Sequence, residues 1–253
     1  MVVALKPSLM LRPPPLTDCA DRPKSSDCES CGARALSVCG AADDPDLQRL
    51  GDLAEVINLK SGAVLIREGE PAPHVFNITG GSLRVYKLLP DGRRQITGFL
   101  FAGDFLGLAI GETYVFSAEA MEASTVCRFR KGPFRALVAN SPPLEHMLLH
   151  RTTHELAAAQ NQMLLLGRKT AQERIASFLL DLPERDPIRP TEEGHIRVPM
   201  TRAEMADYLG LTIETISRGL TKLKTAGVIR LLSLNEMQVD RPERLRAIAE
   251  GEA

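Results

Sequence analysis

Four cysteines are the residues of this chain whose type and spacing most directly indicate chemistry. Cys28, Cys31 and Cys39 follow a C-x2-C-x7-C pattern, and Cys127 lies much later in the sequence. A C-x2-C step brings two sulfur atoms close enough to hold one soft metal centre, and a fourth thiol from another part of the fold would complete four-thiolate coordination. The residues by themselves allow a structural zinc ion, an iron–sulfur cluster or redox-active thiols.

Cys127 needs a separate argument because it stands alone in a run of alternating residue types. A lone cysteine in such a strand is often a small buried core residue. We predict Cys127 as the fourth ligand only because the other three thiols need a fourth to complete four-thiolate coordination. Cys19 precedes the motif, and we interpret it as a spare residue in the leader.

The composition describes a chain that can build a core and that carries one basic region. Of 253 residues, 44% are hydrophobic and 25% are charged, and the net charge is −1. Residues 18–55 hold nine acidic and four basic side chains, whereas residues 197–246 hold nine basic and six acidic ones. The neutral total therefore conceals a basic C-terminal region, which favours a nucleic-acid partner there.

The sequence does not favour a membrane or an exported protein. A membrane-spanning helix needs roughly 18 or more consecutive apolar residues, and the chain has no such run. Lys6, Pro7 and the prolines at 13–15 interrupt the N-terminal stretch, so we expect no secretory signal. We therefore expect the reducing cytoplasm, where thiols serve as ligands or redox groups.

Changes of pattern divide the chain into four parts and predict an α+β protein. Residues 1–42 are expected to form a disordered leader and the cysteine loop. Residues 43–140 open with a helix start at Asp43 and continue as short alternating runs punctuated by glycines, which predict an antiparallel β-roll. Residues 141–168 predict a long dimerisation helix with a hinge around Gly167. Residues 169–253 predict a winged helix-turn-helix domain, in which 182–199 is a loop or a short strand pair.

The long helix carries an apolar seam with alternating steps of three and four residues. This spacing is that of the a and d positions of a coiled coil. The seam fits either a helix packed on its own roll or a parallel pair of helices in a homodimer, and we favour the homodimer. Its residues are Leu149, Thr152, Leu156, Ala159, Met163 and Leu166.

The C-terminal domain shows the signals of a helix-turn-helix. Thr201 and Glu204 form a capping box, Gly210 ends the first helix, and Thr212 caps the second. Two short strand patterns around Asn235 predict a hairpin wing. The second helix is expected to bury Ile213, Ile216, Leu220 and Leu223.

The exposed side of that second helix carries the residue types that recognise base edges. Arginine can bind guanine O6 and N7, and glutamate can accept from cytosine N4. Glu214 and Arg218 are four residues apart, so an ion pair on a solvated face is the alternative. The residues predicted to contact double-stranded DNA are Thr212, Glu214, Thr215, Ser217, Arg218 and Lys222.

The run MTRAEMADYLGLTIETISRGLTKLKTAGVI closely resembles the DNA-binding helices of the CRP/FNR family of bacterial transcription regulators. The resemblance implies a β-roll, a dimerisation helix and a winged helix-turn-helix over nearly the whole chain. In the FNR branch an E-x-x-S-R step, here Glu214, Ser217 and Arg218, reads a TTGAT half-site. This implies a homodimer, mainly an activator, on a TTGAT-N4-ATCAA palindrome. It also implies a contact with RNA polymerase, for which the turn at 90–92 is a candidate.

The cysteines are similar to those of the oxygen sensors of the FNR branch, which bind a [4Fe–4S] cluster. The resemblance implies that Cys28, Cys31, Cys39 and Cys127 hold the iron atoms, and the x7 gap resembles that of alphaproteobacterial FNR-like proteins. A structural zinc ion or a thiol-redox site in the same DNA-binding regulator remains the alternative.

Two other functions are not expected. Cyclic-nucleotide receptors of this family carry a phosphate-binding arginine where this chain has Phe116, and an apolar ring cannot neutralise a phosphate. His150 and His154 have the spacing of metal ligands on a helix but lack the glutamate of a zinc protease. With no nucleophile–base arrangement elsewhere, we expect neither a cyclic nucleotide nor an enzyme.

Overall fold

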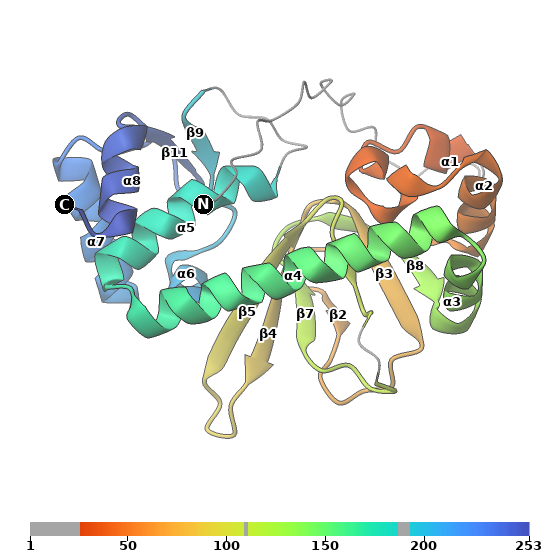
Figure 1. Ribbon diagram of the computed structural model, residues 1–253. Coiled ribbons are helices and arrows are strands. Elements are labelled where there is room, and N and C mark those ends of the chain that lie inside the picture. The colour runs from red at the N-terminus through yellow and green to blue at the C-terminus, as the bar shows by residue number, and fades with distance from the viewer. Residues whose placement is uncertain (1–25, 109–110, 187–192, 253) are drawn as a thin grey trace.

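The computed structural model describes residues 26–108, 111–186 and 193–252. It places a β-roll at the centre, a long helix across it, a cysteine-bearing segment at one end of that helix and a helical domain with a small sheet at the other (Figure 1). The predicted fold class is therefore confirmed. The leader that we expected to be disordered, with Cys19, lies outside the described residues.

The roll consists of two four-stranded antiparallel sheets. The first has the order β1-β8-β3-β6 and the second the order β2-β7-β4-β5. Apolar residues from both sheets, such as Ile78, Leu83 and Val126, fill the space between them. The strands are β1 (Glu55–Leu59), β2 (Val64–Ile66), β3 (His74–Gly80), β4 (Ser82–Leu88), β5 (Arg94–Phe101), β6 (Phe105–Leu106), β7 (Ser117–Ala120) and β8 (Ser124–Arg130).

The outer face of the first sheet is covered by the N-terminal segment and by helices. Because side chains alternate along a strand, Phe76 and Ile78 of β3 point into the roll while Val75 points outward. Val75 and Phe129 pack there beneath α2 (Asp44–Leu53), α3 (Lys131–Ala139) and the start of the long helix. Helix α2 begins as predicted, because Asp43 caps it by accepting a hydrogen bond from the backbone of Asp46.

The cysteine-bearing segment forms short helical turns on this face. They are α1 (Ser26–Glu29), η2 (Arg34–Leu36) and η3 (Val38–Ala41). Each is too short to be stable alone, so their positions depend on contacts with the roll and with the long helix. The segment η3, which contains Cys39, lies against that helix.

The long helix α4 spans Pro142–Arg168 and is about 40 Å long at 1.5 Å per residue. Gly167 lies in the last turn of α4, so the helix ends close to the position that we expected. The helix ends at Arg168, and α5 (Ala171–Arg185) starts from a capping box formed by Thr170 and Glu173. The chain changes direction in the two residues that follow Arg168, between the end of α4 and the start of α5. Among the described residues no helix is long and apolar enough to cross a membrane.

The C-terminal domain combines helices with a three-stranded sheet of order β10-β11-β9. Strand β9 (His195–Arg197) arises from the proline-rich stretch that we interpreted as a loop or a strand pair, and it joins β11 instead of pairing locally. The predicted wing is confirmed by β10 (Ile229–Leu231) and β11 (Glu236–Val239). The helices are α5, α6 (Arg202–Leu209), α7 (Ile213–Thr225) and α8 (Pro242–Glu250).

The outer face of the second roll sheet is covered by this C-terminal domain. Tyr86, Ile96 and Phe99 of β4 and β5 belong to the same buried cluster as residues of α5, α6 and α7. Phe99 lies 5.1 Å from Tyr208 between ring centroids. One continuous core therefore joins the roll to the helix-turn-helix.

Candidate DNA-reading head and cysteine site

The helix-turn-helix is built by local signals that the sequence displays. Thr201 accepts a hydrogen bond from the backbone N–H of Glu204, whose carboxylate accepts from the backbone of Thr201. Gly210 ends α6 in the left-handed conformation with φ of 62°, which favours glycine. Thr212 then caps α7 by accepting from the backbone N–H of Thr215 at 3.2 Å. These caps fix where α7 begins and therefore which residues face outward.

Helix α7 buries one side and exposes the other. Ile216, Leu220 and Leu223 are buried as predicted, but Ile213 is 48% exposed, so its predicted core position is wrong. Ile213 lies at the first position of the helix, beyond the reach of the core, and sequence periodicity alone could not show this. Of the residues predicted to contact DNA, Thr215 is half-buried and donates its backbone N–H to the capping hydroxyl of Thr212. The others are exposed: Thr212, Glu214, Ser217, Arg218 and Lys222.

The alternative role of Glu214 and Arg218 as a surface ion pair lacks support. In the part of the chain that the structure describes, no ion pair within 4.0 Å joins them. The backbone N–H of Glu214 and the hydroxyl of Thr212 at the helix start lower the pKa of the Glu214 carboxyl, with a smaller contribution from Arg218. Glu214 is therefore an exposed acceptor, and Arg218 is an exposed donor one turn later.

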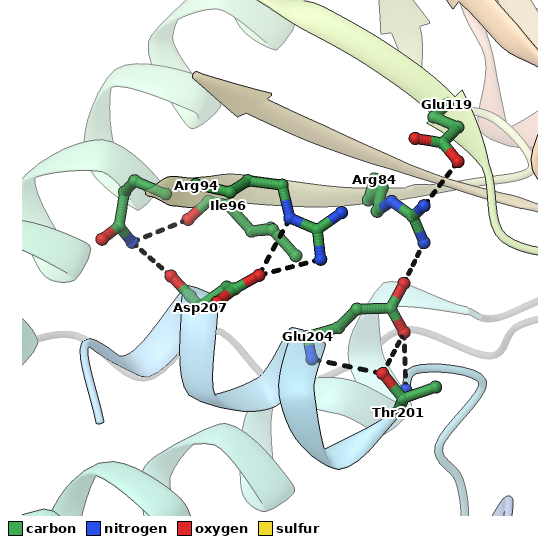
Figure 2. Close-up of polar contacts among 8 residues, drawn as sticks. Arg84, Arg94, Ile96, Glu119, Thr201, Glu204 and Asp207 are labelled. Atoms are coloured by element: carbon green, nitrogen blue, oxygen red, sulfur yellow. Dashed lines mark hydrogen bonds and ion pairs between the residues drawn. The ribbon is translucent and has the colours of Figure 1, made fainter. Parts of the chain in front are cut away.

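Ion pairs connect the first helix of this head, α6, to the roll (Figure 2). Arg84 of β4 contacts both Glu204 and Glu119, the latter at 2.5 Å. Arg94 of β5 donates to Asp207 at 2.9 Å. Because Glu204 also belongs to the capping box, the start of α6 and the roll share one buried charged network.

Two further contacts fix the head. Gln95 donates to the backbone carbonyl of Asp207 at 2.7 Å. Arg174 of α5 donates to the carbonyls of Leu166 and Lys169 at the end of α4 and to that of Leu209 at the end of α6. Sequence reasoning missed Arg174, because nothing local marks a side chain whose partners are carbonyl groups at two distant helix ends.

The predicted cysteine ligands lie near one another at the other end of α4. Cys28, Cys39 and Cys127 pack on one apolar cluster that includes Phe129 and Leu144. Cys31 packs with Leu36 on an adjacent small cluster that includes Ala33 and Ala102. All four thiols are half-buried.

Cys127 points toward the cysteine-bearing segment. It occupies β8, next to β1 and β3, and its side chain shares the outer face with Val75 and Phe129. Sequence alternation left its direction open, because either face of a two-sided strand can be apolar. The outward direction removes the simple interpretation of Cys127 as a residue of the roll interior.

Burial raises the pKa of the Cys39 thiol, while a hydrogen bond with Ser37 lowers it and the neighbouring Cys31 raises it. Among the described residues, no three Cys, His, Asp or Glu side chains lie close enough to hold a single metal ion. The described thiols therefore lie on two apolar clusters and do not form a compact mononuclear metal site.

The predicted seam on α4 lies mostly on the surface. Leu149, Leu156 and Met163 are 65%, 59% and 66% exposed. Thr152 and Ala159 are exposed as well, whereas Leu166 is half-buried and lies near Gly210. An apolar stripe of this kind is typical of a surface that a partner covers. It is not packed on the roll of the same chain.

A cavity of about 310 Å³ opens between the roll and α4. Phe116, Leu106 and Leu100 give it a largely apolar lining. Arg151 and Glu155 enter it from α4, and Asp104 enters it from the turn between β5 and β6. Phe116 is packed against the core of the roll.

Comparison with known proteins identifies both structured parts. Residues 56–141 match the cyclic nucleotide-binding domain family, and residues 173–248 match the Crp-like helix-turn-helix domain family. FixK of Bradyrhizobium diazoefficiens, a nitrogen fixation regulation protein, is 39% identical over 90% of this chain and 95% of its own length. The transcriptional activator FnrL of Cereibacter sphaeroides is 37% identical over 81% and 84%. The solved structure of FixK2 from Bradyrhizobium japonicum is 35% identical, with a TM-score of 0.72 over 77% of this chain and 96% of that one.

The chain belongs to the CRP/FNR family of transcription regulators. Within this family it is a transcriptional activator of the FNR/FixK type with a DNA-binding helix-turn-helix, and it is not an enzyme.

Proposed function

We propose that this activator senses oxygen through a [4Fe–4S] cluster held by Cys28, Cys31, Cys39 and Cys127. The outward direction of Cys127 carries the proposal, because it brings the isolated thiol into the same apolar cluster as Cys28 and Cys39. Four thiols match the donor set of such a cluster. When bound, the cluster reacts with oxygen, so that its presence reports low oxygen.

The alternatives use the same thiols. A single zinc ion needs all its ligands at about 2.3 Å from one point, and the spread of the cysteines over two neighbouring apolar clusters disfavours it. The ligands of a multinuclear cluster bind different iron atoms and so lie farther apart. A thiol-redox site stays the second candidate, because Cys28, Cys31 and Cys39 lie in one short segment.

The cysteine segment has a direct route to the dimer seam. The segment η3 lies against α4, and Leu144 and Leu148 of α4 belong to the apolar cluster on which Cys28 and Cys39 pack. The adjacent residue Leu149 opens the exposed seam. We propose that an ordered cysteine site holds α4 in the position that pairs the seam, and that loss of the bound group loosens it.

Anaerobic purification tests the cofactor. We expect a coloured protein that contains iron and sulfide, and a Cys127→Ser variant that loses both. Cys19→Ser is the matched control and should keep the colour. A colourless wild-type protein that still binds DNA fully would reject the cluster, and stoichiometric zinc would favour the first alternative.

The homodimer is proposed from the exposed stripe of α4. Leu156→Glu places a charge in the seam and should shift the anaerobic protein from dimer to monomer in analytical ultracentrifugation. Leu164→Glu is a close control, because Leu164 is 58% exposed but lies off the seam. Equal behaviour of the two variants would contradict the seam.

We propose that each subunit reads one half-site of a TTGAT-N4-ATCAA-type palindrome through Glu214, Ser217 and Arg218. A bidentate arginine–guanine contact contributes about 1–3 kcal/mol. Because a dimer makes this contact twice, Arg218→Ala should lower the affinity of the dimer for DNA on the order of 30-fold or more. It should also relax selectivity at one base of each half-site. Arg246→Ala on α8 removes the same charge outside the helix-turn-helix and should leave selectivity unchanged. A uniform loss on all sequences would indicate a phosphate contact.

The remaining partners follow from the same role. We propose that the apolar cavity beside Phe116 takes no cyclic nucleotide, which isothermal titration with cyclic AMP checks. As an activator, the protein is expected to contact RNA polymerase, and the tip of the β4–β5 hairpin at 90–92 is our candidate surface. A chromosome-binding regulator works in the bacterial cytoplasm, the compartment that we propose.

A further inference from the structure

A buried amide lies in the apolar face that carries the cysteine site. Asn77 is only 1% exposed, and its Oδ1 atom has no hydrogen-bond partner among the described residues. Leaving a buried polar group unpaired costs about 1–3 kcal/mol. An apolar side chain of the same size would avoid that cost, so the amide needs a role that packing does not supply.

The strand register places Asn77 beside the cysteine site. On β3 it is paired with Cys127 of β8 on one side and with Phe105 of β6 on the other. Opposite side chains on neighbouring strands have Cβ atoms about 5 Å apart. Its neighbours Phe76 and Ile78 point into the roll, so Asn77 points outward with Val75.

The outer face on which Asn77 lies carries apolar side chains and three of the thiols. Val75, Phe105 and Phe129 belong to the cluster on which Cys28, Cys39 and Cys127 pack. The amide is therefore buried on the face that also carries these sulfur atoms. In such surroundings of low polarity a hydrogen bond to a charged group is stronger than it is in water.

We propose that Asn77 is a positioning residue for the cysteine site and donates an N–H to a sulfur of the bound group beside Cys127. The inference rests on the proposed cluster function. The oxygen and nitrogen of a carboxamide are nearly alike in size, so a half-turn of the Asn77 amide presents its N–H donors where Oδ1 now lies. Anionic sulfur is an acceptor, so it repels Oδ1 and attracts the N–H.

The hydrogen bond has two consequences that can be measured. Donors that contact the sulfurs of a bound cluster raise its reduction potential, and outer groups of this kind typically change affinity or activity by about 10–100-fold. Asn77 therefore slows the oxidation of the bound group and sets how much oxygen the protein tolerates before the site is lost.

The experiment uses the full-length protein purified without oxygen, as wild type and as the variants Asn77→Leu and Asn77→Asp. Leucine has the shape of asparagine without the donor, and aspartate adds a negative charge. The control is Asn58→Leu, because Asn58 is exposed on β1 of the same sheet and its side chain already accepts from Thr125. We measure iron content, the decay of visible absorbance in air-saturated buffer, the reduction potential and the melting temperature of the metal-free protein.

We expect the absorbance of Asn77→Leu to decay about tenfold faster than that of the wild type, with a lower potential, and Asn77→Asp to bind less iron. Asn58→Leu should behave as wild type. The metal-free Asn77→Leu protein should be at least as stable as wild type, because the unpaired amide is gone.

Two results would overturn the inference while the proposed function stands. One is an iron-loaded Asn77→Leu protein with wild-type decay and potential. The other is a metal-free Asn77→Leu protein that melts well below wild type, which would show that the amide has a structural role. An iron-free wild-type protein would instead reject the proposed function.

Discussion

The two ends of α4 are attached to the roll by different kinds of contact (Figure 1). At the C-terminal end, the reading head shares a continuous core with the second roll sheet and is joined to it by the pairs Arg84–Glu204 and Arg94–Asp207. At the N-terminal end, residues 28–41 rest on the first sheet through apolar contacts and thiols. Among the described ion pairs, none joins this segment to the rest of the chain.

This difference suggests that the C-terminal domain stays attached to the roll under all conditions, whereas the attachment of residues 28–41 depends on a bound group. A core with buried ion pairs is stable without any ligand, whereas short helical turns, which have little hydrogen bonding of their own, belong to the low-stability parts of a fold. In the proposed sensor the weak region would be the one where the ligand binds. Residues 28–41 carry three of the four proposed ligands, and Cys127 faces them from β8. The helix α4 contacts both regions, so in the proposed function a change at the cysteine end would reach the proposed dimer seam without displacing the head from its own roll.

The strongest test of this comparison removes the charge that holds the head. Arg84→Leu leaves Glu204 and Glu119 buried without their partner, and breaking a buried pair in this way costs about 3 kcal/mol. Urea unfolding should show this loss, with the head becoming sensitive to proteases. Arg67→Leu is the control, because Arg67 is 62% exposed with a contact of 3.9 Å to Glu70. If Arg84→Leu unfolds like the control, the ion pairs do not hold the head.

The second test loosens the cysteine end without altering a thiol. Gly103 has φ of +101°, and an added Cβ would lie 2.7 Å from the Cβ of Leu36. Gly103→Ala should lower the free energy of unfolding by about 2 kcal/mol and accelerate cleavage within 28–41. Gly92→Ala shares the left-handed backbone but has nothing within 4 Å, so it should cost about 1 kcal/mol and leave cleavage unchanged. Equal cleavage in both variants would mean that Leu36 does not anchor the segment.

The third test concerns Asp104, which lies between the cysteine segment and α4. Burial raises the pKa of its carboxyl to about 6, with the N–H of Phe101 acting in the opposite direction. Between pH 4 and 6 the folded protein then binds more protons than the unfolded chain, so stability falls as the pH rises through this window. Asp104→Asn should lack this fall and be about 1–2 kcal/mol more stable at pH 7, allowing for the 28% exposure of the side chain. Parallel pH profiles for the two proteins would contradict this account.

The smallest expected effect belongs to Arg94, which together with Arg84 joins the head to the roll. Arg94 and Asp207 are partly exposed, so Arg94→Ala should cost only about 0.5–1 kcal/mol in urea unfolding. Arg93→Ala on the same hairpin loses only a local contact with Asp91 and should be close to neutral. Identical midpoints for the two variants would assign the attachment to Arg84 and the shared core alone.

Much of the fold could be predicted from the sequence because its signals are local. The capping box at Thr201, the turn at Gly210, the cap at Thr212 and the alternating strands depend on residues only a few positions apart. The end of α4 near Gly167 also follows from the sequence. The exposure of Ile213 was predicted wrongly, because the core does not reach the first position of α7.

The sequence by itself determined the class of the protein, the outward residues of α7 apart from Thr215, and the four thiols that could act together. Only the tertiary structure decided the direction of Cys127, the attachment of the head through Arg84 and the burial of the Asn77 amide. It also decided the hydrogen bonds from Arg174 to the carbonyl groups that end α4 and α6. These features join residues far apart in the chain. Their geometry depends on how two sheets and a long helix pack, and no local pattern of residues encodes that packing.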